Sequence, residues 1–253
     1  MTDTSGVTDL EIDSPPRRGK GPPEARLPWA PLLVMALTGF VIIMTETAPA
    51  GLLPQLASGL RISEALAGQL VSAYALGTVL AAVPAIRLTE RISRKPLLLI
   101  GIGGFAAANA VTALAGGFAV ALGARFVAGA FSGLLWGMIA YARAIVPPSR
   151  AGSGLAVAMV GTPIALSIGT PLGSLAGAMV GWRWTFAALS MIAVGLICWA
   201  LVAVPNRPGR STAERTPVLR VLGIRGVAPV LLVVFTWMLG HNILYTYIAP
   251  YLA

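Results

Sequence analysis

One acid and one base lie deep within long apolar stretches of the sequence, where a charge is costly. Glu46 falls in the stretch 31–56 and Arg125 in the stretch 118–145. A charge near the middle of a membrane costs at least about 2.5 to 3.5 kcal/mol on insertion scales, so each residue needs a structural or functional reason to be there. This acid and this base are therefore the first candidates for chemistry.

The depths of the two residues nearly coincide if both stretches are helices that enter the membrane from opposite sides. At a rise of about 1.5 Å per residue, Glu46 lies about 22 Å from the start of its helix, and Arg125 lies about 10 Å from the start of its own. In a hydrocarbon core about 30 Å thick the side chains can therefore pair. A carboxyl that pairs reversibly with an arginine can take up and release a proton, so we predict proton coupling through Glu46 and Arg125. The alternative is a static structural pair.

The elements that position these residues are apolar helices. Of the 253 residues, 57% are hydrophobic and 11% are charged, and the mean hydropathy of +0.82 excludes an ordinary soluble domain. A membrane-spanning helix needs about 20 apolar residues. Seven stretches satisfy this requirement, and they predict an all-α polytopic membrane helical bundle: 31–56, 65–86, 96–115, 118–145, 151–180, 184–204 and 227–252.

The basic residues predict how these helices are oriented. The net charge of +9 comes from residues before the first stretch and after the second, fourth and sixth, which explains the charge without a nucleic-acid partner. Basic loops stay in the cytoplasm. We therefore predict an inner (plasma) membrane protein with a cytoplasmic N-terminus. Its predicted parts are a disordered tail (1–28), six transmembrane helices (29–205), a cytoplasmic central loop (206–226) and a seventh helix (227–253).

Small residues and prolines predict close but distorted helix packing. Glycines recur at spacing four in the stretch 118–145, at Gly129 and Gly133, and throughout the stretch 151–180. Such spacing lets helix backbones approach within a membrane, although a sequence so rich in glycine also produces it by chance. Pro163 and Pro171 remove backbone donors, so we expect the fifth helix to bend. For Pro54, a helix end explains the residue equally well.

Several motifs in this order resemble those of a transporter family. Residues 88–95 are similar to the loop signature G-x-L-A-D-R-x-G-R-K, with Glu90 at the acidic position and Ser93 where glycine is usual. The segment 125–129 is similar to R-x-x-Q-G. Residues 169–173 resemble the antiporter signature of the fifth helix, and 181–186 resemble a G-W-R-x-x-F turn.

The chain therefore resembles the major facilitator superfamily, in particular the drug:proton antiporter branch that includes sugar-efflux and chloramphenicol-efflux permeases. The resemblance covers the six-helix N-terminal half of a twelve-helix fold and one helix of the second half. It implies proton-coupled export of a small organic compound or drug by alternating access, within a lipid bilayer and without a cofactor. It also implies that Gly169, Pro171 and Gly173 form the helix-five antiporter motif.

The resemblance further implies a cytoplasmic latch between the two halves. The latch residues are four charged side chains after the second helix: Glu90, Arg91, Arg94 and Lys95. The alternative is that these positive charges only keep the loop in the cytoplasm.

Polar and aromatic residues at membrane depth are candidates for a substrate cavity, which in an exporter is mainly apolar with a few polar groups. The candidates are Tyr74, Asn109, Trp136, His241, Asn242 and Tyr245. Each can instead be a packing residue. His241 is the single histidine and Cys198 the single cysteine, so we expect no metal site.

Two alternative functions must be weighed against transport. An intramembrane enzyme needs a nucleophile with a base, or paired acids, and the apolar stretches offer neither. A phosphate-binding loop is likewise not evident, so we expect no enzyme activity. The second alternative is a truncated membrane protein that does not transport, or a half-transporter that needs a homodimer or a separately encoded second half.

Overall fold

The computed structural model describes residues 26–89, 92–137, 139–208 and 223–252, and this part of the chain contains helices and no strands. Six of its helical segments are long and apolar enough to cross a membrane. They are Trp29–Gly51, Glu64–Ala82, Arg94–Leu114, Phe118–Leu135, Pro148–Val180 and Trp182–Ala203. The predicted all-α membrane bundle is confirmed.

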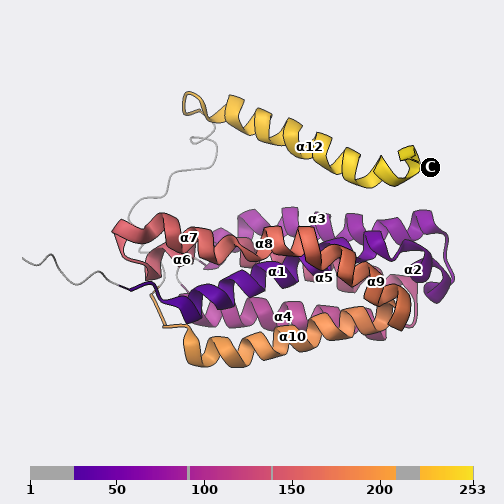
Figure 1. Cartoon of the computed structure of the whole chain (residues 1–253), viewed down its shortest axis with the longest axis horizontal. Helices are drawn as coiled ribbons and strands as arrows, with labels where there is room; N and C mark the ends of the chain where they lie inside the picture. Colours follow the sequence, from indigo (N-terminus) through magenta and orange to yellow (C-terminus); the bar gives the residue numbers. More distant parts are fainter. Residues whose placement is uncertain (1–25, 90–91, 138, 209–222, 253) are drawn as a thin grey trace, which may run out of the picture.

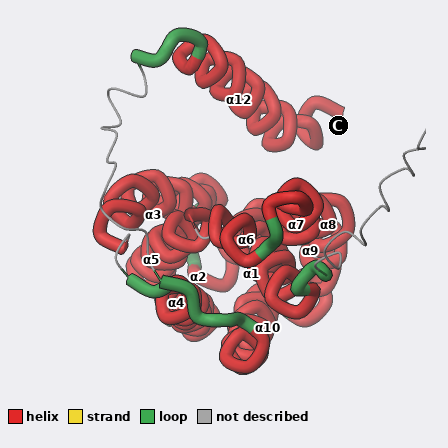
Figure 2. The backbone as a smooth tube through the Cα atoms, turned by 90° about the vertical axis from the view of Figure 1, so that its left-hand side faces the viewer, coloured by secondary structure: helices red, strands yellow, loops and turns green. Residues whose placement is uncertain are grey.

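The first transmembrane helix, α1 (Trp29–Gly51), lies at the centre of the bundle and contacts most other helices. Around it, α3 (Glu64–Thr89) packs extensively on α5 (Phe118–Gly137), and α4 (Arg94–Leu114) packs on α10 (Trp182–Ala203). Figure 1 shows these helices side by side, and Figure 2 views the bundle at right angles to it. A short helix, α6 (Ile139–Ile145), continues the fourth span.

Glycines bring helix backbones into direct contact at two interfaces. A Cβ atom added to Gly129 of α5 would lie 2.0 Å from the carbonyl oxygen of Tyr74 in α3. In the fifth span, a Cβ atom on Gly161 would lie 1.7 Å from the carbonyl oxygen of Ala36 in α1. Neither position has room for a side chain, so these glycines are packing residues, as their spacing predicts.

The first predicted stretch, 31–56, is two helices instead of one. The α1 helix ends at Gly51, and α2 (Leu53–Leu60) begins after Leu52 with Pro54 in its first turn. The prediction of a single helix through residue 56 is wrong because proline has no N–H group and favours the first turn of a new helix.

The fifth span is irregular along its length. It consists of a 3₁₀ turn η1 (Pro148–Arg150), α7 (Ala151–Met159), α8 (Gly161–Ile164), a π-helical turn η2 (Ala165–Gly169) and α9 (Thr170–Val180). Pro163 and Pro171 flank the π-helical turn and lack the N–H groups that a regular helix requires. Within this turn, the Ser167 hydroxyl donates to the Pro163 carbonyl at 2.7 Å. The predicted distortion of this span is confirmed.

The turn between α9 and α10 depends on Gly181, whose φ of +92° is a conformation that side chains disfavour. Two residues later, Arg183 donates to the Ala115 carbonyl at 3.0 Å, just beyond the end of α4. The same guanidinium lies 4.2 Å from the centre of the Trp182 ring. The turn therefore ties the start of α10 to the end of α4.

The helix predicted over 227–252 is present as α12 (Val227–Leu252), and both views show it apart from the bundle. Its side chains from Val230 to Leu239 are exposed. Most of the predicted tail (1–28) and most of the predicted central loop (206–226) lie outside the described residues.

Candidate proton-coupling and substrate site

Arg125 of α5 is completely buried in the bundle, with an exposed fraction of 0%. Its guanidinium carbon lies 4.6 Å from the ring centre of Tyr74 and 5.5 Å from that of Phe186. The Nε atom donates weakly to the Leu70 carbonyl, at 3.5 Å. Aromatic rings attract a cation that lies over them, and this cage from α3 and α10 holds the charge in place.

The two terminal nitrogens of this guanidinium have no hydrogen-bond partner within the described part of the chain. Three other buried atoms of the described residues share this property: the Ser132 hydroxyl of α5, the Oδ1 atom of Asn109 and the Oε1 atom of Gln55. Buried polar groups are normally hydrogen-bonded, and a buried charge without partners is especially costly. A carboxylate can accept hydrogen bonds from these two nitrogens of Arg125.

Glu46 of α1 is half-buried, and its carboxyl interacts electrostatically with Arg125. No direct ion pair joins the two residues, both of which the structure describes, because the terminal nitrogens of Arg125 have no partner. The two charges are near enough to interact but are not in contact in this conformation, and their pairing stays a prediction. A small movement of α1 relative to α5 would change their separation.

Two hydrogen bonds hold α1 in place beside these charges. The Asn109 side-chain amide donates to the Thr45 hydroxyl at 3.2 Å, and both side chains are fully buried. The Tyr74 hydroxyl donates to the Ile42 carbonyl at 3.5 Å. Tyr74 and Asn109 were predicted to line a substrate cavity. The structure buries both side chains within the helical bundle, next to Glu46 and Arg125.

The other four predicted cavity residues are placed only by their backbones. Trp136 lies in α5, whereas His241, Asn242 and Tyr245 lie in α12, and the side chains of all four are outside the described part of the structure. Their contribution to a cavity stays a prediction.

The helix-five motif packs directly on the segment of α1 that carries Glu46. A Cβ atom on Gly169 would lie 2.6 Å from the Met44 sulfur, and one on Gly173 would lie 2.5 Å from the Met44 methyl. The hydroxyls of Thr170 and Thr47 lie 3.0 Å apart. Pro171 is exposed. A shift of the π-helical turn would therefore act directly on α1 beside Glu46.

The structure describes two of the four predicted latch residues, Arg94 and Lys95. Glu90 and Arg91 lie outside the described residues. Arg94 donates its backbone N–H to the Arg207 carbonyl at 2.9 Å, and the Lys95 amine donates to the Leu201 carbonyl at 2.6 Å. These bonds tie the start of α4 to the end of α10, so they lie within one half. A latch to a second half stays a prediction.

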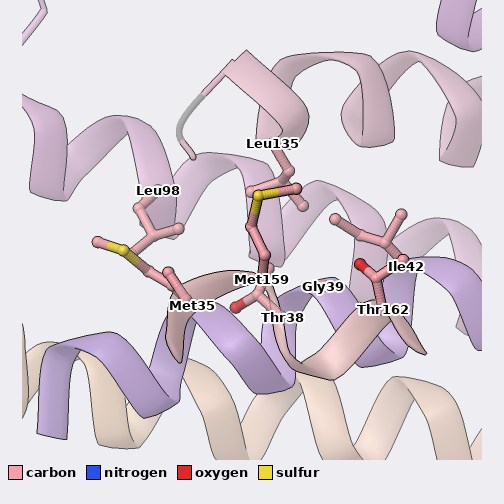
Figure 3. A pocket seen from close by; sticks show the side chains of 9 residues that line it. Met35, Thr38, Gly39, Ile42, Leu98, Leu135, Met159 and Thr162 are labelled. Atoms are coloured by element: carbon pink, nitrogen blue, oxygen red, sulfur yellow. The ribbon is translucent and has the colours of Figure 1, made fainter. Parts of the chain in front are cut away.

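A small pocket, with room for about one water molecule, lies between α1, α4, α5 and the first part of the fifth span (Figure 3). Its lining contains no charged residue. The lining residues are Met35, Thr38, Gly39, Ile42, Leu98, Leu135, Ala158, Met159 and Thr162.

Sequence reasoning did not find this pocket, nor the contact of Phe186 with Arg125. The spacing from Arg125 to Ser132 is two helical turns, which places them on one face and could have identified Ser132 as a further buried polar residue. The pocket depends on how two helices cross, and the sequence pattern carries no signal for it.

Comparison with known proteins gives a consistent result. The family model of the Major Facilitator Superfamily matches residues 35–253. A chloramphenicol efflux pump of Mycobacterium tuberculosis is 33% identical over 87% of this chain and 55% of its own length. A chloramphenicol resistance protein of Streptomyces lividans is 38% identical over 76% of this chain and 49% of its own. A purine ribonucleoside efflux pump of Shigella dysenteriae is 28% identical over 88% and 57%.

Among solved structures, the peptide transporter POT in complex with sulfate matches with a TM-score of 0.62 at 15% identity. The match covers 87% of this chain and 48% of that one, and at this identity it shows a common fold alone. The chain spans about half the length of the curated relatives it matches.

Proposed function

We propose that this chain, which belongs to the Major Facilitator Superfamily, forms one wall of a secondary transporter that exports a small organic compound. Relatives named for the efflux of chloramphenicol, sugars and purine ribonucleosides support export as the direction of transport. The family is one of transporters and not of enzymes. The substrate is proposed only as a class, because these relatives differ in the compounds they export.

The proposed energy source is a proton gradient, coupled through Glu46 and Arg125. One observation carries this proposal: a fully buried arginine with two free terminal nitrogens lies near a half-buried carboxyl without contacting it. In the ionised state the carboxylate is attracted toward the guanidinium. One proton from the outer side neutralises the carboxylate and removes that attraction, and its release to the cytoplasm restores it. One conformation of the bundle would thereby favour ionised Glu46, and the other would favour protonated Glu46.

The irregular fifth span supports a mechanism of alternating access. Transporters use interrupted helices where the backbone must bend within the membrane. Here the π-helical turn η2 sits between two prolines and presses Gly169 against α1 near Glu46. We propose that this turn bends when Glu46 is protonated, and that the bend moves the rest of the helical bundle.

We further propose that the protein lies in the inner (plasma) membrane with its N-terminus in the cytoplasm, as the basic loops predict. One six-helix wall cannot enclose a central cavity, so transport requires a second wall. A second half-transporter or a second copy of the chain can provide it. The apolar helix α12 supports this requirement, because its side chains from Val230 to Leu239 are exposed.

The test is proton-driven uptake of radiolabelled chloramphenicol into everted membrane vesicles that contain the protein with its second wall. We expect the wild type to accumulate the drug when the vesicle interior is acidified. Glu46→Gln should abolish this accumulation while membrane insertion is unchanged. Glu64→Gln is a matched control, because Glu64 is exposed at the start of α3. Undiminished gradient-driven accumulation by Glu46→Gln would contradict proton coupling through this residue.

A further inference from the structure

Three basic residues meet at one end of the bundle, where α4 begins and α10 ends. The backbone N–H of Arg94 donates to the Arg207 carbonyl at 2.9 Å, so the start of α4 lies against the segment that follows α10. Lys95 belongs to the same contact, because its amine donates to the Leu201 carbonyl at 2.6 Å. Figure 1 shows the start of α4 and the end of α10 at the same end of the bundle. We call Arg94, Lys95 and Arg207 the basic cluster.

A buried tyrosine shows that two of these charges converge. The Tyr141 hydroxyl of α6 donates to the Pro205 carbonyl, which fixes the segment after α10 against α6. The same hydroxyl lies within electrostatic reach of the guanidinium groups of both Arg207 and Arg94. Two positive charges from different helix ends therefore act on one point of the structure.

No acidic side chain of the described residues balances this cluster. Of the nine acids in the chain, the described part contains Glu46, within α1, and Glu64, at the start of α3 and thus at the opposite end of the bundle. Glu90 precedes Arg94 by four residues and lies outside the described residues. Among the described residues, the guanidinium groups of Arg94 and Arg207 have neither an ion-pair nor a hydrogen-bond partner. Arg207 is exposed and Arg94 is partly exposed, so an anion can reach both.

The cluster lies at the depth of lipid headgroups and beside apolar surface. The 21 residues of α4 span about 31 Å, which matches a hydrocarbon core about 30 Å thick and places Arg94 at the membrane surface. Side chains next to the cluster are apolar and exposed, by 51% at Leu201, 89% at Val202 and 54% at Ile100. Acyl chains can cover these side chains, whereas a free phosphate would leave them uncovered.

We propose that the basic cluster binds the phosphate group of an anionic phospholipid in the cytoplasmic leaflet. Guanidinium groups donate paired N–H groups to phosphate oxygens, so Arg94 and Arg207 can share one phosphate. Lys95 adds a third charge while its amine stays bonded to α10. Basic pockets between transmembrane helices on the cytoplasmic side bind such headgroups. The choice of leaflet rests on the proposed orientation, but lipid binding does not depend on export.

The alternative is that these charges only keep their loops in the cytoplasm. That role requires positive charge but no convergence on one point. Arg143 separates the two explanations, because it lies in the last turn of α6 at the same end of the bundle and is exposed. It is not among the charges that act on the Tyr141 hydroxyl. Arg143 is therefore a matched control.

The binding test titrates the purified whole chain in mild detergent with two lipids and measures bound lipid by native mass spectrometry. Dioleoylphosphatidylglycerol and dioleoylphosphatidylcholine have the same acyl chains and one phosphate each, but choline cancels the negative charge. We expect phosphatidylglycerol to bind saturably and about tenfold more tightly than phosphatidylcholine. Equal affinities for the two lipids would overturn the proposal.

A soluble headgroup distinguishes a lipid site from a site for free phosphate compounds. We expect sn-glycerol 3-phosphate at millimolar concentration to leave phosphatidylglycerol bound, because it lacks the acyl chains that cover the apolar surface. Displacement of the lipid by sn-glycerol 3-phosphate would overturn the assignment to a phospholipid.

Variants then locate the bound lipid. Arg94→Gln and Arg207→Gln should each weaken binding of phosphatidylglycerol about fivefold, the effect of one basic residue near an anionic surface, and together about 25-fold. The bond between the two residues joins backbone atoms, so folding should persist and is checked by gel filtration. Arg143→Gln should leave the affinity unchanged. Equal effects of all three single variants, or no effect of any, would overturn the proposal.

Lipid binding and export have separate readouts. Selective binding of phosphatidylglycerol by a protein that exports nothing would support the basic cluster and contradict the proposed function. Export by a protein that does not distinguish the two lipids would overturn the lipid site and leave the proposed function intact.

Discussion

Two helix interfaces of this protein use glycine in the same way but differ in what lies around the contact. Along the α3–α5 interface, Gly77, Gly129 and Gly133 bring the backbones together at successive turns of unbroken helices. Between α1 and the fifth span, Gly161 provides one such contact, with the pocket on one side and the π-helical turn on the other. Repeated contact makes a rigid pair of helices that holds Arg125. A single backbone contact constrains the fifth span less, although Gly169 and Gly173 also pack on the Met44 side chain.

The largest expected effect comes from breaking the rigid interface. Gly129→Val should prevent proper folding, because a Cβ atom there would lie 2.0 Å from the Tyr74 carbonyl oxygen and the two helices would have to separate. We expect a loss of about 3 kcal/mol, near the upper end for overpacked cores. The measurement is the fraction of protein that elutes as a single species in gel filtration after extraction in mild detergent.

The control is Gly123→Val in the same helix, where an added Cβ atom meets nothing within 4 Å. Both variants place a β-branched residue in α5 and differ only in the surrounding space. Similar behaviour of the two would show that helix propensity, and not the backbone contact with α3, determines the outcome.

A second prediction asks whether the rigid interface holds Arg125 for function or for stability. Arg125→Met should leave stability unchanged or raise it, because the buried guanidinium has a single weak hydrogen bond and a charge that costs energy to bury. The same variant should abolish proton-driven export. Thermal unfolding in detergent measures the first effect and the vesicle assay measures the second.

The opposite pattern would identify Arg125 as part of a static structural pair. Breaking a buried ion pair typically costs about 3 to 5 kcal/mol, so a large loss of stability would contradict the proposed role. Arg125→Lys provides a further comparison. It keeps the charge but lacks the planar group that fits between the rings of Tyr74 and Phe186, and we expect it to transport poorly.

The sequence predicts a feature of an interface when the physical effect behind it acts within one helix, and not when it acts between helices. Apolar length is a property of one segment, so six spans were predicted correctly. The cost of a buried charge singled out Glu46 and Arg125, and the structure buries Arg125, but the role of the two residues stays a prediction. Glycine spacing predicted both close contacts. The sequence left open whether Pro54 bends a helix or marks the end of one, and the structure places it in the first turn of α2.

The features that sequence reasoning missed all depend on how two or more helices cross. Phe186 reaches Arg125 from α10, and the pocket arises from α1, α4, α5 and the fifth span together. A pattern within one helix does not contain this information.

A third prediction tests the flexibility of the fifth span. Pro171→Ala restores an N–H group after the π-helical turn and should favour a regular helix there. We expect the rate of export to fall several-fold with little change in stability, because lost bending slows the conformational step. Pro84→Ala is the control, since Pro84 lies inside the regular helix α3. Equal rates for wild type and Pro171→Ala would remove the fifth span from the proposed mechanism.

The smallest expected effect concerns the hydrogen bond that holds α1 between the two interfaces. Thr45→Val removes the hydroxyl that accepts from Asn109 at 3.2 Å, and it should lower the free energy of unfolding by about 1 kcal/mol. Thr236→Val is the control, because the Thr236 hydroxyl bonds only within the exposed helix α12. Asn109→Leu combined with Thr45→Val completes a double-mutant cycle, read by thermal unfolding. If the bond only stabilises the fold, export should follow stability. If it also sets the position of α1, the double variant should lose proton coupling beyond its loss of stability, because Glu46 is the next residue along α1.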